Sequence, residues 1–118
     1  MLSINHKTSA MLAKLKELGI TKEIHSEDTF SFGDTLFATP EQMFNLFGEP
    51  QHNRNVGWSK TNFEWSLSLN GSPFAIYDWK EYRVLNMNEE IEWRIASNKR
   101  EVSSAAVSMI NEFIEALA

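Results

Sequence analysis

The sequence predicts an α+β fold, in which an antiparallel β-meander of three or more strands carries helices on one face. Apolar and polar residues alternate with a period of two along residues 62–69 and 91–96, which is typical of half-buried strands. Residues 73–79 read as the strand that returns between them. Apolar residues recur at helical spacing over 99–117 and predict a long C-terminal helix. A length of 118 residues fits a single domain, 1–118.

The N-terminal part of the chain predicts one helix and one hairpin. Residues 7–18 place apolar side chains on one stripe, with charged side chains facing away from it. Over residues 29–38 an apolar segment precedes Gly33-Asp34 and another follows, so we expect a hairpin that turns at these two residues. The predicted apolar stripe of the helix consists of Met11, Leu12, Leu15 and Leu18.

A capping box predicts a short helix over 40–47. Thr39 can accept a hydrogen bond as the N-cap, Pro40 suits the first helical position, and Gln42 can return a bond to the N-cap amide. Gly48 then ends the helix. The polar residues 51–61 that follow read as a loop.

The dipeptide Asn70-Gly71 predicts a two-residue hairpin turn, and this turn sets which side chains share a face of the sheet. With two residues in the turn, Trp65 and Leu67 face the core together with Phe74 and Ile76. The expected core comprises Trp65, Leu67, Trp93, Met109, Ile110 and Phe113. By alternation, Tyr77 and Trp79 face outward with Glu64, whereas a three-residue turn would reverse the two faces.

Composition excludes several functions. The chain has no cysteine, which rules out disulfides and thiolate chemistry, and its net charge of −5 includes no basic stripe, which disfavours nucleic-acid binding. Residues 1–10 contain no apolar run of signal-peptide length, and no stretch of the chain is apolar enough to span a membrane. We therefore expect a cytoplasmic protein that has no nucleic-acid or membrane partner.

Few residues suggest catalysis or metal binding. His6, His25 and His52 lie far apart in the sequence, so we predict no zinc site and no other cofactor. Glu64, Asp78 and Glu92 come from three consecutive strands and could form an acid–base group on one sheet face. With Lys80 and Arg94, the same carboxylates could instead form a ladder of cross-strand ion pairs, which is the more common arrangement.

Four blocks of the sequence resemble a recurring set of small bacteriophage proteins of unassigned function. They read Phe-Gly-Glu-Pro at 47–50, Glu-Trp at 64–65, Ile-Tyr-Asp-Trp-Lys at 76–80 and Glu-Trp-Arg-Ile at 92–95. In that set the last block tends to read Glu-Trp-His-Ile-Gly-Gly, so Arg94 here replaces a histidine. The resemblance covers roughly residues 40–98 and implies no particular activity.

A weaker likeness concerns shape alone. A capped helix followed by strands that carry tryptophan, over 39–79, resembles the helix-then-meander unit of outer-membrane assembly lipoproteins and β-lactamase inhibitor proteins. This chain has no cysteine for a lipid anchor, which argues against a lipoprotein role. In the inhibitor proteins a sheet face grips an enzyme, and the likeness implies a similar use here by analogy.

Together these observations predict a small phage-encoded binding protein in the bacterial host cytoplasm. It would engage a host or host-defence protein, and inhibition is one way in which it would act. A small hydrolase or nucleotide-handling enzyme that uses the clustered carboxylates is the first alternative. A homodimer whose aromatic face is its own interface is the second. The predicted binding residues are Glu64, Tyr77, Trp79, Lys80, Glu92 and Arg94.

Overall fold

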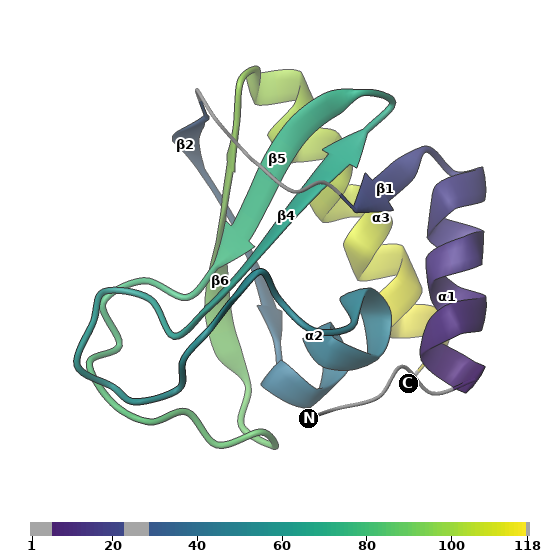
Figure 1. Ribbon diagram of the computed structural model, residues 1–118. Helices are drawn as coiled ribbons and strands as arrows, with labels where there is room; N and C mark the ends of the chain where they lie inside the picture. Colours follow the sequence, from purple (N-terminus) through teal and green to yellow (C-terminus); the bar gives the residue numbers. More distant parts are fainter. Residues whose placement is uncertain (1–5, 23–28, 118) are drawn as a thin grey trace.

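The computed structural model describes residues 6–22 and 29–117 (Figure 1). His25 and the start of the chain, residues 1–5, lie outside the described residues. The elements in chain order are α1 (His6–Glu17), β1 (Ile20–Lys22), β2 (Phe30–Ala38), α2 (Pro40–Phe47), β3 (His52–Asn53), β4 (Phe63–Leu69), β5 (Ser72–Tyr77), β6 (Ile91–Ser97) and α3 (Arg100–Leu117).

The strands of the described part of the chain form one six-stranded sheet. Its order is β1-β4-β5-β6-β2, and the short strand β3 also pairs with β4. Every pairing is antiparallel. The predicted α+β class, the meander β4-β5-β6 and the long C-terminal helix are therefore confirmed. Strands β1 and β3 are additions that are too short to leave a clear alternation in the sequence.

The predicted two-residue turn is confirmed. Leu69 pairs with Ser72, so Asn70 and Gly71 alone form the turn, with φ angles of 50° and 85°. Positive φ at both positions is the requirement of a type I′ turn, which Asn-Gly satisfies with little strain. The register that follows has Trp65 opposite Ile76, as the alternation predicts.

The predicted hairpin at 29–38 is wrong. Residues 30–38 instead form the single edge strand β2, which pairs with β6 on both sides of an irregularity between Ser31 and Thr35. Gly33 and Asp34 lie within this irregularity, so the chain bulges there and does not reverse. The two apolar halves of the segment then continue along one partner strand, and this long-range pairing overrides the local turn signal.

The three helices of the described residues all contribute side chains to one core against the inward face of the sheet. Leu15 comes from α1, Phe47 from α2 and Ile110 from α3, and they belong to the same buried cluster as Trp65 and Trp93. The expected core residues are buried, except that Met109 packs at its edge. Leu18, which follows α1, is 47% exposed, so its place in the predicted apolar stripe is wrong.

Hydrogen bonds fix the two core tryptophans, Trp65 and Trp93, and the start of α2. The indole Nε1 of Trp65 donates to the Gly48 carbonyl, and that of Trp93 donates to the Ala38 carbonyl, each at 2.9 Å. The predicted capping box is present, because the Gln42 amide donates to Thr39 Oγ1 at 3.0 Å and the Thr39 amide donates to Gln42 Oε1 at 2.9 Å. No helix among the described residues has the length and apolar character to cross a bilayer.

Candidate functional site

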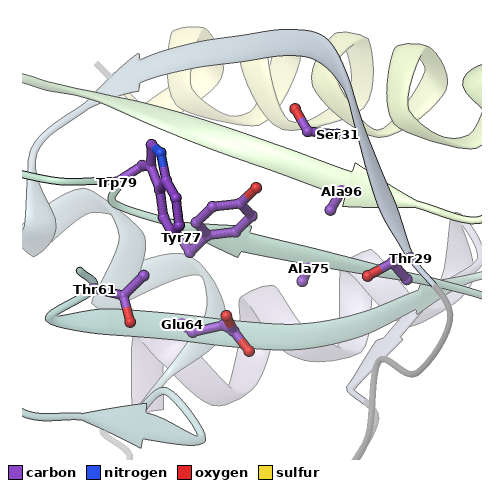
Figure 2. A pocket seen from close by; sticks show the side chains of 8 residues that line it. All are labelled: Thr29, Ser31, Thr61, Glu64, Ala75, Tyr77, Trp79 and Ala96. Carbon is purple, nitrogen blue, oxygen red and sulfur yellow. The ribbon is translucent and has the colours of Figure 1, made fainter. Parts of the chain in front are cut away.

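A pocket opens on the face of the sheet that points away from the core; we call this the outer face (Figure 2). The pocket has a volume of about 310 Å³. In Figure 2 its side chains stand in front of the strands, with helices behind the sheet. Its lining residues are Thr29, Ser31, Thr61, Glu64, Ala75, Tyr77, Trp79 and Ala96.

Small residues make the pocket possible. Ala75 on β5 pairs with Ala96 on β6, and both point to the outer face at the middle of the sheet. Because neither side chain extends beyond a methyl group, the sheet surface is lower there than at the neighbouring positions. The larger lining residues Glu64, Tyr77 and Trp79 stand around this floor (Figure 2). The result is a concave surface on a rigid sheet, which suits a binding site.

Tyr77 and Trp79 form one wall, as the alternation from Asn70-Gly71 predicts. Their ring centroids lie 5.9 Å apart with an interplanar angle of 84°, an edge-to-face arrangement. Both rings are partly buried rather than exposed, which corrects the expectation of exposed aromatic side chains. Each ring shields the other, so a polar substitution here would cost more stability than a change at an open surface.

Two lysines flank this wall. The Nζ atom of Lys80 lies 5.4 Å from the centroid of Trp79, and that of Lys60 lies 5.8 Å from the same ring, distances typical of cation–π contacts. The Lys80 amide also donates to the Lys60 carbonyl at 2.7 Å, which joins the two chain segments beside the ring. Lys80 was predicted for the site, whereas Lys60 was missed because residues 51–61 read only as a loop.

Glu64 stands opposite Tyr77 across the β4–β5 pairing. Its side chain is partly buried, and burial raises the pKa of the Glu64 carboxyl above 4.5, an effect that His52 on β3 partly offsets. No hydrogen bond or ion pair holds this carboxylate within residues 6–22 and 29–117. Glu64 is therefore a partly desolvated carboxylate that lines the pocket, and its acceptor positions are filled by no described residue.

Tyr77 is fixed by its surroundings. Burial raises the pKa of the Tyr77 phenol, and the carboxylate of Glu64 adds to this, while Arg94 and a hydrogen bond with the Ser31 side chain act in the opposite direction. Arg94 pairs with Tyr77 on one side and with Thr35 on the other. The ring is thus held between β2, β4 and β6 in one orientation, which pre-organises the wall of the pocket.

Of the six predicted site residues, Glu92 lies farthest from the pocket. It is exposed and pairs with Phe37 on the edge strand β2, away from the residues that line the pocket. Four of the six predicted residues gather closely, namely Glu64, Tyr77, Trp79 and Lys80. Arg94 adjoins them beside Tyr77, and Glu92 lies beyond them.

The carboxylate cluster required by the enzyme alternative is not formed. Asp78 is fully buried, and its oxygens accept the Phe63 amide at 2.8 Å and the Asn62 amide at 2.9 and 3.1 Å. Asp78 therefore organises the backbone, while Glu64 faces the pocket and Glu92 lies at the exposed margin. The ion-pair ladder is also absent among the described residues, where the salt bridges join Arg83 to Glu81 and Glu89.

A second organised surface, which sequence reasoning missed, is formed by the paired loops, residues 54–62 and 78–90, which run side by side (Figure 1). The Asn55 side chain both donates to the Leu85 carbonyl at 2.8 Å and accepts its amide at 2.7 Å. Asn62 Nδ2 donates to the Arg83 carbonyl, and Asn62 Oδ1 accepts the Gly57 amide. The loops together expose a group of large apolar side chains, Val56, Trp58, Tyr82 and Val84.

Metal binding finds no support in the described part of the chain, where no three His, Asp or Glu side chains converge as a ligand set. His52 takes part in a structural contact, with its Nε2 atom 3.3 Å from the Thr61 carbonyl oxygen. Comparison with known proteins gives no relative: no family model, no curated protein and no solved structure matches the chain.

Proposed function

We propose that this chain is a small protein-binding domain whose outer sheet face engages its partner. The observation that supports this best is the pocket walled by Tyr77 and Trp79 with lysines at its rim. Tyrosine and tryptophan combine large apolar area with a polar tip, and they are enriched among the residues that contribute most to protein interfaces. Their fixed orientation on a sheet lowers the entropy lost on binding.

The identity of the partner is proposed from the sequence. The blocks shared with small bacteriophage proteins favour a phage origin, and a phage protein of this size that binds a partner in the bacterial cytoplasm would meet a host or host-defence protein. The use of a sheet face to inhibit an enzyme, as in the β-lactamase inhibitor proteins, is the analogy that favours inhibition.

The test begins with capture and ends with purified components. The immobilised chain is incubated with bacterial lysate, the retained protein is identified by mass spectrometry, and its affinity is then measured by calorimetry with both proteins purified. We expect Trp79→Ala to weaken binding about thirtyfold, which corresponds to roughly 2 kcal/mol for an interface hot spot. Trp58→Ala removes an exposed tryptophan from the loop surface and should leave the affinity unchanged.

Two results would contradict the proposal. If Trp58→Ala abolishes binding and Trp79→Ala does not, the paired loops are the interface and the outer face is not. If the chain sediments at twice its monomer mass, and Trp79→Ala returns it to a monomer, the partner is a second copy of the same chain. Circular dichroism of each variant establishes that the fold is retained.

A further inference from the structure

We propose that the outer-face pocket takes a basic side chain, a lysine or an arginine of the partner protein, with Glu64 as its counter-ion. This inference rests on the proposed protein-binding function and names the chemistry that its site recognises. It follows from three features of the pocket: a carboxylate that no described residue holds by a hydrogen bond or ion pair, an aromatic ring beside it, and the positions of the surrounding charges.

The first feature is the Glu64 carboxylate. Exposed carboxylates need no partner because water solvates them, but a partly buried one loses much of that solvation. Glu64 is in this position, as burial raises the pKa of its carboxyl, and no described residue donates a hydrogen bond to it. A guanidinium or ammonium group that enters the pocket would replace the lost solvation with charge-assisted hydrogen bonds.

The second feature is the ring of Tyr77, which stands directly across from Glu64 on the neighbouring strand. A cation that contacts the Glu64 carboxylate therefore also meets an aromatic surface, which adds a cation–π contribution. Ser31 and Thr61 supply hydroxyl groups to the lining, and these can accept further hydrogen bonds from a guanidinium group. A volume of about 310 Å³ lies at the lower end of the range for ligand pockets, which suits a single long side chain.

The third feature is the distribution of charge around the pocket. Lys60 and Lys80 lie over Trp79, so they repel an incoming cation from the Trp79 end of the pocket. The end between Glu64 and Tyr77 stays open to that cation. Arg94 lies beyond Tyr77 on β6, and His52 adjoins Glu64 from β3, on the side away from Tyr77. The charge of His52 partly offsets the rise in the pKa of the Glu64 carboxyl, so His52 is the neighbouring cation that acts on this group.

The experiment uses small probes that isolate one side chain. Nα-acetyl-arginine amide and Nα-acetyl-lysine amide are titrated separately into the ¹⁵N-labelled chain. Nα-acetyl-citrulline amide, which has nearly the shape of arginine without its charge, is the matched control. We expect the two cations to shift the amide signals of Thr61, Glu64 and Tyr77 with dissociation constants on the order of 1–10 mM, because one partly exposed ion pair contributes little.

Two substitutions then assign the charge. Glu64→Gln should weaken binding of the arginine probe about fivefold, the upper end for one partly exposed ion pair. Glu92→Gln removes the same charge from the margin of the same face and should leave binding of the probe unchanged. For the unsubstituted chain, binding should also weaken as the pH falls through the pKa of Glu64. Thermal unfolding of each variant confirms that the fold is intact.

The inference is overturned if citrulline amide shifts the same signals equally, if no probe shifts them, or if Glu64→Gln binds as well as the original chain. Its failure can be told apart from failure of the proposed function. A partner that is lost on Trp79→Ala but retained on Glu64→Gln removes the basic-side-chain inference and leaves protein binding in place. If the arginine probe binds at Glu64 but the affinity of the chain for its partner does not depend on Trp79, recognition of a basic side chain remains. The proposed protein-binding role of the outer face then fails.

Discussion

Replacement of Asp78 should destabilise the protein more than its position after the end of a strand suggests. Its carboxylate is 0% exposed and accepts hydrogen bonds from three donors: the amides of Asn62 and Phe63, and Asn62 Nδ2 at 3.2 Å. In Asp78→Ala all three donors lose their acceptor. An unsatisfied buried donor costs about 1–3 kcal/mol. We therefore expect a loss of roughly 3–5 kcal/mol, allowing for water to reach one of the donors.

The effect should extend from the strand into the paired loops. Asn62, which Asp78 orients, also donates to the Arg83 carbonyl and accepts the Gly57 amide. Loss of Asp78 thus frees the side chain that joins residues 57 and 83. Hydrogen exchange should show reduced amide protection at Asn62, Phe63 and Gly57, while amides at the centre of β6 change less.

The assay is urea denaturation followed by tryptophan fluorescence, with the free energy of unfolding obtained by linear extrapolation. Glu81→Ala is the matched control, because it also removes a carboxylate, three residues further along the chain. The ion-pair partner of Glu81 is Arg83, which lies at the surface. Exposed salt bridges contribute about 0–1 kcal/mol, so this variant should stay within that range. A loss below about 1 kcal/mol for Asp78→Ala would refute the reasoning, since it would mean that water satisfies the donors.

Three further predictions concern the core, the site and the loops. Trp93→Ala should lower the free energy of unfolding by about 3–5 kcal/mol, because the side chain is fully buried. Trp58→Ala should change it by less than about 0.5 kcal/mol, because Trp58 is 74% exposed. A loss for Trp58→Ala as large as that for Trp93→Ala would contradict the core assignment. Because the folded-state pKa of Glu64 is raised, the folded chain holds its proton more tightly than the unfolded chain, and Glu64 opposes folding increasingly as the pH rises above 4.5. Glu64→Gln should therefore be the more stable protein near neutral pH and lose this advantage at low pH, and a constant difference in melting temperature across pH would disprove the assignment. Gly57→Ala should cost about 2–4 kcal/mol, because φ is +79° and a β-carbon would lie 2.6 Å from the Arg83 carbonyl carbon. Gly71→Ala has a similar φ but meets nothing within 4 Å, so it should cost only about 1 kcal/mol, and equal losses for the two variants would mean that the loops can separate.

Local patterns in the sequence were enough to predict the elements that depend on neighbours along the chain. The capping box at Thr39 needs only a hydroxyl and an amide three residues apart, and the structure contains it. Asn70-Gly71 accepts positive φ at two successive positions, so the turn length, the register and the face of Tyr77 all follow from that dipeptide. These features are set by backbone sterics within a few residues, which is why sequence alone determines them.

Tertiary structure decided the features that depend on residues far apart. The Gly33-Asp34 segment has a local turn signal, but pairing along β6 makes it a bulge, because ladder hydrogen bonds on both sides outweigh a local preference. The sequence places both Asp78 and Glu64 in or just after a strand. Only the fold buries Asp78 against Asn62 and puts Glu64 in a pocket where no described residue forms a hydrogen bond or ion pair with it. Sequence spacing specifies where a side chain points from its own strand. Which groups it meets there depends on the strands and loops that the folded chain brings alongside, and those contacts determine its charge, its burial and its use.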